Sequence, residues 1–181
     1  IVALLFAMAL TARAELKTDI EFTKAGDVSL TLDAFVPDGD GPFPTAILVH
    51  GGGFTKGDKT SFIKPLFAPL SEAKFTWFTI NYRLAPQYKF PAPVEDVEAA
   101  VRWVKAHAAE YKVDPRRIAL MGESAGGHLV AMVAVRQTKE TRVAAVVGVL
   151  TAIGLWFASA YNGEYRIFIG GFDAALATHA R

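Results

Sequence analysis

The sequence contains no cysteine, and this absence excludes several kinds of site at once. Without thiols the chain has no disulfide framework, no cysteine nucleophile and no thiolate ligand for zinc or an iron–sulfur cluster. It also lacks an excess of charge of one sign, because 19 lysines and arginines face 18 aspartates and glutamates, for a formal net charge of +1. Binding to phosphate backbones usually needs a basic surface, so nucleic acid is not expected as a partner.

Long hydrophobic runs are scarce, and neither of the two candidates predicts a membrane span. Residues 1–10 are apolar throughout, but a spanning helix needs roughly 18 such residues. The small residues Ala12 and Ala14 follow with the pattern of a cleavage site, so we interpret residues 1–14 as the remnant of a signal peptide rather than a buried N-terminal segment. We therefore expect a secreted or periplasmic protein. Residues 143–163 carry no charge, but their β-branched first half is typical of a buried strand.

The remaining chain has the composition of one globular domain. Apolar residues make up 52% of its 181 residues and charged residues 20%, which is ample for a single core. Hydrophobic patterning predicts strands at 20–24, 28–35, 46–50, 77–81, 118–122 and 143–150, and helices at 66–73, 94–104 and 126–136. Strands that alternate with helices predict the α/β class, with a mostly parallel sheet and helices on both faces.

A serine lies in a tight turn between a predicted strand and a predicted helix. Residues 122–126 read GESAG, the G-x-S-x-G pattern of a nucleophile elbow, in the strand–turn–helix context that this pattern requires. The turn is so tight that the neighbours of the serine must be small, and the helix behind it leaves free N–H groups at its positive end. The pattern predicts Ser124 as a nucleophile and the N–H of Ala125 as an oxyanion donor, against the alternative of a turn without function.

A second glycine-rich turn follows another predicted strand. Residues 50–54 read HGGGF, the form of the oxyanion loop of esterases and lipases. Backbone N–H donors must approach the developing charge closely, and side chains would obstruct them. We therefore predict Gly52 and Gly53 as oxyanion donors. His50 is expected to orient the loop by hydrogen bonding rather than to act as a base.

These motifs together resemble the α/β-hydrolase serine esterases, in particular the hormone-sensitive-lipase-like enzymes and the bacterial acetyl or feruloyl esterases of the BD-FAE type. The resemblance runs from about residue 46 to residue 149. It is carried by HGGGF at 50–54, GDK at 57–59, NYRLAP at 81–86, FPAPVED at 90–96 and GESAGG at 122–127. It implies an acyl-enzyme mechanism, a triad in the chain order serine, acid and histidine, and no metal or organic cofactor.

The sequence departs from that family where the acid and the histidine should follow two further strands. None of the four histidines, His50, His107, His128 and His179, suits the role, and His128 is expected to pack along its helix. Asp173 could follow a strand at 165–169, but it lies only six residues from His179, too few for the crossover between parallel strands. Residues 15–181 are thus predicted to form a single α/β-hydrolase domain that lacks its last strands and, alone, hydrolyses esters feebly or not at all.

The sequence predicts a carboxylic ester hydrolase, with short-chain acyl esters or acetyl and feruloyl esters of polysaccharide as the substrate class that the resemblance suggests. A serine peptidase on the same fold is one alternative, which the HGGG form of the loop disfavours. A binding module that keeps the fold without catalysis is another, since a fold alone does not confer activity. The presence of Ser124 argues against it.

Overall fold

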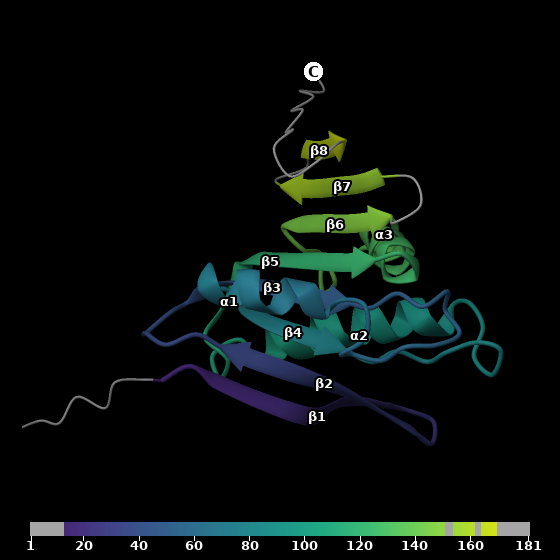
Figure 1. The fold of residues 1–181 in the computed structure, drawn as a ribbon, viewed down its shortest axis with the longest axis horizontal. Helices are drawn as coiled ribbons and strands as arrows, with labels where there is room; N and C mark the ends of the chain where they lie inside the picture. The colour runs from purple at the N-terminus through teal and green to yellow at the C-terminus, as the bar shows by residue number, and fades with distance from the viewer. Residues whose placement is uncertain (1–12, 151–153, 162–163, 170–181) are drawn as a thin grey trace, which may run out of the picture.

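The computed structural model describes residues 13–150, 154–161 and 164–169. Within them the backbone forms one sheet whose strands lie in the order β1-β2-β4-β3-β5-β6-β7-β8, from the bottom to the top of Figure 1. The strands are β1 Glu15–Ala25, β2 Val28–Val36, β3 Phe43–Val49, β4 Thr76–Ile80, β5 Val113–Glu123, β6 Ala145–Leu150, β7 Gly154–Tyr161 and β8 Glu164–Ile169. Every strand predicted from the sequence is present.

The centre of the sheet is parallel and both of its sides are antiparallel. Strands β4, β3, β5 and β6 run in one direction, which confirms the α/β class. The strands predicted at 20–24 and 28–35 form the antiparallel hairpin β1–β2, and β2 pairs antiparallel with β4. On the other side β7 pairs antiparallel with β6, and β8 with β7.

Strand β7 had no counterpart in the sequence prediction. From the sequence no strand was predicted in the interval 151–164, and only a possible strand at 165–169 was considered. Instead β7 begins at Gly154, so residues 151–153 alone join it to β6. A parallel connection takes a dozen or more residues, and a linker of this length therefore permits only an antiparallel return.

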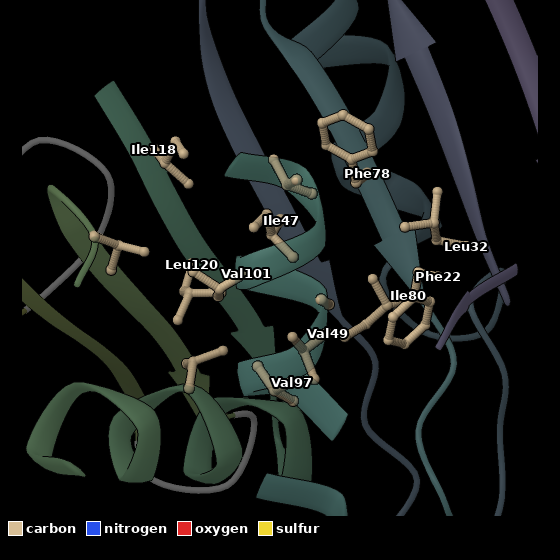
Figure 2. Close-up of a cluster of buried hydrophobic side chains, with 14 of the residues drawn as sticks. Phe22, Leu32, Ile47, Val49, Phe78, Ile80, Val97, Val101, Ile118 and Leu120 are labelled. Carbon is tan, nitrogen blue, oxygen red and sulfur yellow. The ribbon is translucent and has the colours of Figure 1, made fainter. Parts of the chain in front are cut away.

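Helices cover both faces of the sheet, as predicted. Helices α2 (Ala92–Ala106) and α3 (Ala125–Arg136) lie on one face, and α1 (Phe67–Glu72), preceded by the short 3-10 helix η1 (Lys64–Leu66), lies on the other. Strand β3 shows why: Ile47 and Val49 join the core beneath α2 and α3 (Figure 2), whereas Ala46 and Leu48 join the core beneath α1. Side chains of a strand alternate between faces, so a fully apolar strand serves both layers.

The valine stripe of α2 forms its buried face. Val94, Val97, Val101 and Val104 are each at most 1% exposed, as their helical spacing predicts. Burial of a side chain of this size contributes about 1.5 to 3 kcal/mol, so this stripe is a main source of stability on that face.

The segment before the nucleophile strand bulges out of the sheet. Phe43 pairs with Val113 but Thr45 already pairs with Ile118, so the four residues 114–117 of β5 lie opposite Pro44 alone. The structure carries the strand through this irregularity as a β-bulge.

Two sequence expectations concerned a membrane span at 143–163 and a signal peptide at 1–14. The charge-free stretch 143–163 holds strands β6 and β7, and no helix in the described part of the chain is long and apolar enough to cross a bilayer. The signal-peptide prediction for residues 1–14 falls almost entirely on residues 1–12, which lie outside the described residues.

Candidate active site

The two glycine-rich turns predicted from the sequence meet at one edge of the sheet. Val49 pairs with Gly122 across the parallel strands β3 and β5, so both turns leave the sheet at the same end. A side-chain carbon on Gly126 would lie only 2.1 Å from the Val49 carbonyl oxygen, and one on Gly51 only 2.9 Å from the carbonyl oxygen of Glu123. The backbones of the two turns are therefore in direct contact.

Ser124 occupies a strained position at the junction of β5 and α3. Its φ of 51° and ψ of −114° lie in a region that residues with side chains rarely adopt. The turn is closed by its glycines, because a side-chain carbon on Gly122 would lie 2.3 Å from the carbonyl carbon of Gly126. Strain of this kind persists where the surrounding structure holds it and is concentrated at functional sites. The geometry is that required of a nucleophile elbow.

The start of α3 presents free backbone donors beside the serine. Ser124 is the N-cap residue, yet its side chain makes no capping hydrogen bond, and the first turn carries no acidic residue. Ala125 is the first residue of the helix, and the first N–H groups of a helix have no partner within it. An anion that develops at this point would be stabilised by these donors and by the helix dipole.

The loop after β3 turns sharply around Gly52. The N–H groups of Thr55 and Lys56 both donate to the Gly52 carbonyl oxygen at 3.2 Å. Gly52 has a φ of 106°, and a side-chain carbon there would lie 2.0 Å from the Lys56 carbonyl oxygen. Gly53 has a φ of 62° but open space around it. Of these two glycines, only Gly52 is therefore required by both its backbone conformation and a close approach.

His50 is buried under the loop and held there from two sides. It is 1% exposed, its Nδ1 lies 2.7 Å from the Gly51 carbonyl oxygen, and its ring stacks on Tyr82 with 4.3 Å between centroids. The Tyr82 hydroxyl donates to the His50 carbonyl oxygen at 3.0 Å. Burial lowers the pKa of His50, against smaller opposing effects of Gly51 and Asp58. A neutral, hydrogen-bonded ring suits the loop-orienting role, which stays a prediction.

We expect the free energy of unfolding to decrease as the pH falls below about 6.5, and His50 to account for part of the decrease. The pKa of His50 is lowered from 6.5 in the folded state, so the unfolded chain binds the proton more readily. The contribution of His50 is thus present above pH 6.5 and lost below it. Urea titrations between pH 7.5 and 5 should show a shallower pH dependence for His50→Gln than for the wild type. Equal slopes would contradict the assignment.

A buried ion pair that the sequence analysis did not single out fixes the segment opposite the oxyanion loop. The Arg83 Nε and Nη2 donate to Asp96 Oδ1 at 2.9 and 2.7 Å, and the Arg83 backbone N–H donates to Asp96 Oδ2 at 2.8 Å. The hydrogen bonds to Asp96 raise the pKa of Arg83. Two residues further on, the N–H of Ala85 donates to the Phe54 carbonyl oxygen at 2.8 Å. A signal was available, since Asp96 is four residues before Ala100 and so shares the buried face of α2.

An apolar pocket of about 350 Å³ lies between this segment, the oxyanion loop and α3. Its lining consists of Phe54, Ala85, Tyr88, Lys89, Phe90, Pro93, Val94, His128 and Leu129. Phe54 follows the glycines of the oxyanion loop and is itself at a φ of 64°, which is unusual for a bulky residue. The pocket is therefore built from residues next to both predicted catalytic turns.

His128 is not packed in the interior as the sequence analysis expected. It is exposed, because it lies on the outward side of α3. Its ring meets that of Phe54 edge-on, with centroids 5.8 Å apart, so it belongs to the lining of the pocket.

The acid and the base of a triad are not identified among the described residues. His107 ends α2 and stacks on Trp103 with 4.0 Å between centroids, far along that helix from the elbow. In the described part of the chain no histidine ring is hydrogen-bonded to Ser124, and His128 contacts it only through the backbone, where its N–H donates to the Ser124 carbonyl oxygen at 3.2 Å. Asp173 and His179, which the sequence analysis weighed, lie outside the described residues.

Known proteins with similar sequences include carboxylic ester hydrolases and a deacetylase by name. The chain is 42% identical over 94 residues to the probable carboxylic ester hydrolase LipM of Mycobacterium tuberculosis, covering 52% of this chain and 22% of LipM. It is 40% identical over 90 residues to arylacetamide deacetylase of Bos taurus, covering 48% of this chain and 23% of that protein. The chain thus spans about a quarter of the length of these curated relatives.

Solved structures of esterases share the fold. A bacterial heroin esterase matches with a TM-score of 0.63 and 34% identity, over 76% of this chain and 44% of that one. Esterase 2 of Thermogutta terrifontis, phosphonylated by cyclosarin, matches with a TM-score of 0.65 and 27% identity, over 77% of this chain and 57% of that one. The BD-FAE family model matches residues 32–158, a span that holds both glycine-rich turns and most of the sheet. The chain has the α/β-hydrolase fold and belongs to the BD-FAE family.

Proposed function

We propose that the protein is a serine carboxylic ester hydrolase that acts through an acyl-enzyme. The observation that carries the proposal is the strained Ser124 at the start of α3, in a turn whose backbone touches the glycine loop after β3. The names of the relatives and of the solved neighbours support it. Because the chain covers about a quarter of those relatives, the proposal concerns the complete gene product.

In the proposed reaction the Ser124 Oγ attacks the carbonyl carbon of the ester. The hydroxyl proton passes to a base, a tetrahedral oxyanion forms, and the alcohol leaves with a proton as the acyl-serine ester forms. Water then attacks this ester, which releases the carboxylic acid and restores the serine. Ester and water are thereby converted to acid and alcohol.

The backbone supplies the stabilisation of the oxyanion. We assign the donors to the N–H groups of Gly52, Gly53 and Ala125, which come from the two turns in contact. His50 orients the loop from below. Preorganised donors of this kind act on charge that exists only in the transition state.

The apolar pocket favours an ester with an apolar group, such as a short alkyl or aromatic substituent. Its lining includes the rings of Phe54, Tyr88 and Phe90, which offer apolar and stacking contacts. Short-chain acyl esters and acetyl or feruloyl esters of polysaccharide are the proposed substrate class. We also propose that the protein is exported, because residues 1–14 combine an apolar run with the small residues of a cleavage site.

Replacing Phe54 with asparagine should change substrate preference more than stability. Asparagine tolerates a positive φ better than other residues with side chains, so the loop is kept while the ring is lost. We expect kcat/KM for an ester with a larger apolar group to fall about 10-fold relative to an acetate ester, the effect of one or two lost methylene contacts. The measurement compares p-nitrophenyl butyrate with acetate, and phenyl acetate with ethyl acetate. Unchanged ratios in both pairs would remove the pocket from the substrate site.

A fluorophosphonate probe on the complete gene product tests the proposal. We expect one labelled residue, Ser124, and hydrolysis of p-nitrophenyl acetate. A label without hydrolysis of any ester would favour the catalytically degenerate binding module, and cleavage of peptides without esters would favour the peptidase. An unlabelled, folded protein would refute the nucleophile.

A further inference from the structure

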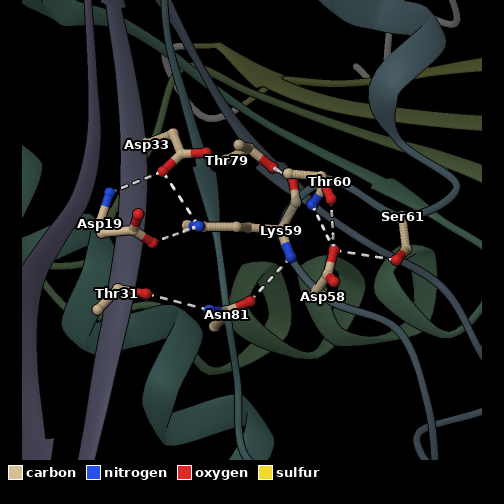
Figure 3. A network of polar contacts seen from close by, with 9 residues as sticks. All are labelled: Asp19, Thr31, Asp33, Asp58, Lys59, Thr60, Ser61, Thr79 and Asn81. Carbon is tan, nitrogen blue, oxygen red and sulfur yellow. Dashed lines mark hydrogen bonds and ion pairs between the residues drawn. The ribbon is translucent and has the colours of Figure 1, made fainter.

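A charged cluster centred on Lys59 lies behind the oxyanion loop (Figure 3), with Lys59 and Asp33 buried and Asp19 exposed at the surface. The Lys59 Nζ donates to Asp19 Oδ1 at 2.8 Å and lies 3.2 Å from Asp33 Oδ1. Lys59 is 9% exposed and Asp33 6%. Burial by itself would lower the pKa of Lys59, but the hydrogen bonds that its ammonium group donates to the two carboxylates, together with their negative charge, outweigh burial and raise the pKa. The lysine is therefore charged and fixed in place.

The backbone of the same residue is held as firmly as its side chain. The Lys59 N–H donates to Asn81 Oδ1 at 2.8 Å, and the Lys59 carbonyl oxygen accepts the hydroxyl of Thr79. Asn81 is itself oriented by Thr31, to whose hydroxyl its Nδ2 donates at 3.1 Å. Lys59 is thus attached to β1, to β2, to β4 and to the residue that follows β4.

The cluster lies at the far end of the segment that carries the oxyanion donors. Between the elbow contact at Gly51 and the anchor at Lys59, the chain makes the tight turn around Gly52 and then passes beneath His50. At Gly57 a side-chain carbon would lie 2.9 Å from the His50 Nδ1, so the backbone there packs on the buried ring. The segment has little freedom while both of its ends are held.

The cluster is not explained by stability alone. Two charges taken out of water lose hydration, and apolar residues of similar volume often stabilise a protein as well or better. A buried pair does, however, select one geometry, since only one arrangement satisfies its hydrogen bonds. Asp19 and Asp33 belong to the β1–β2 hairpin, so the pair connects that hairpin to the loop.

We propose that Lys59 is a positioning residue, which holds the segment 52–58 so that the Gly52 and Gly53 N–H groups face the oxyanion beside Ser124. This inference rests on the proposed esterase function. It assigns a catalytic consequence to a residue that touches no substrate. A small displacement of positioned groups can cost up to about 100-fold in rate.

The test uses variants that separate positioning from stability. Lys59→Met removes the side-chain part of the anchor, while the backbone bonds to Asn81 and Thr79 remain, and it leaves the buried Asp33 without its cationic partner, which destabilises the fold. Lys59→Met combined with Asp33→Asn removes both charges and should recover most of the stability. Lys64→Met is the matched control, because Lys64 is an exposed lysine five residues further along the chain, in η1.

The test measures kcat and KM for p-nitrophenyl acetate. It also measures hydrogen exchange of the backbone amides of residues 50–58 and of β3 and β4. In both Lys59 variants kcat should fall about 10- to 100-fold with KM within about 2-fold, because the donors act in the transition state. Exchange should accelerate in 50–58 and stay unchanged in β3 and β4. Lys64→Met should match the wild type in every measurement.

A double variant with wild-type kcat and wild-type exchange in 50–58 would overturn the proposal. A variant that melts at a lower temperature without a change in kcat would do so too, since that is the behaviour of a merely structural residue. If the wild type hydrolyses no ester, the proposed function fails by itself. The exchange of 50–58 in the double variant then still decides whether Lys59 positions the loop.

Discussion

Replacing Ser124 with alanine should abolish ester hydrolysis by the complete gene product, by at least about 1,000-fold in kcat, while the fold stays intact. The substitution removes the nucleophile on which the acyl-enzyme depends. It removes little else, because the Ser124 side chain makes no capping hydrogen bond to α3, and alanine is no more strained than serine at a φ of 51°. Hydrolysis of p-nitrophenyl acetate measures the first effect and circular dichroism the second.

Ser124→Gly is the matched control for this prediction. Glycine adopts positive φ without the steric cost that a side chain incurs, so this variant should be equally inactive and more stable than Ser124→Ala. Higher stability in an inactive protein would show that the strain at Ser124 serves catalysis rather than folding. Turnover retained in either variant, at a rate near that of the wild type, would refute Ser124 as the nucleophile.

Gly52→Ala should lower kcat by roughly 100- to 1,000-fold, the usual cost of losing one oxyanion donor. The new side-chain carbon would lie 2.0 Å from the Lys56 carbonyl oxygen, on a backbone with a φ of 106°. The loop must shift to relieve this contact, and the Gly52 N–H moves with it. Because the donor acts on charge present only in the transition state, kcat should fall more than KM rises.

Gly53→Ala separates the contact from the general strain of a positive φ. Gly53 has a φ of 62° with no atom within 4 Å of a side-chain carbon there, so alanine costs about 1 kcal/mol of conformational energy and displaces nothing. We expect a much smaller loss of kcat than in Gly52→Ala. Equal losses in the two variants, or an effect of Gly52→Ala on KM alone, would contradict an oxyanion role for this loop.

Local sequence was sufficient to predict those elements whose structure depends on their own residues. The strand–turn–helix at 118–136, the valine stripe of α2 and the hairpin around Gly26 follow from hydrophobic period and from glycine in the turn. The elbow and the oxyanion loop are likewise short patterns, since each needs small residues at consecutive positions. These features place Ser124 and the glycine loop at the ends of strands before any tertiary contact is known.

Sequence reasoning failed where the deciding interaction joins residues far apart in the chain. The interval 151–164 has no hydrophobic periodicity that distinguishes a connecting segment from a strand. The antiparallel pairing of β7 with β6 depends on β6 being part of the sheet. Asp96 and His128 each lie on helices predicted correctly. Whether such a side chain is buried against Arg83 or exposed beside Phe54 is decided by what packs on the helix.

The amino-acid sequence by itself determined the α/β class, the two glycine-rich turns and the serine between its strand and helix, because each depends on neighbours within a few residues. Only the tertiary structure decided that the turns touch, that Lys59 is anchored to Asp19 and Asp33, and that an apolar pocket opens beside the loop. These contacts join segments tens of residues apart. Their geometry exists only once the parallel order of β4, β3 and β5 brings the strand ends together.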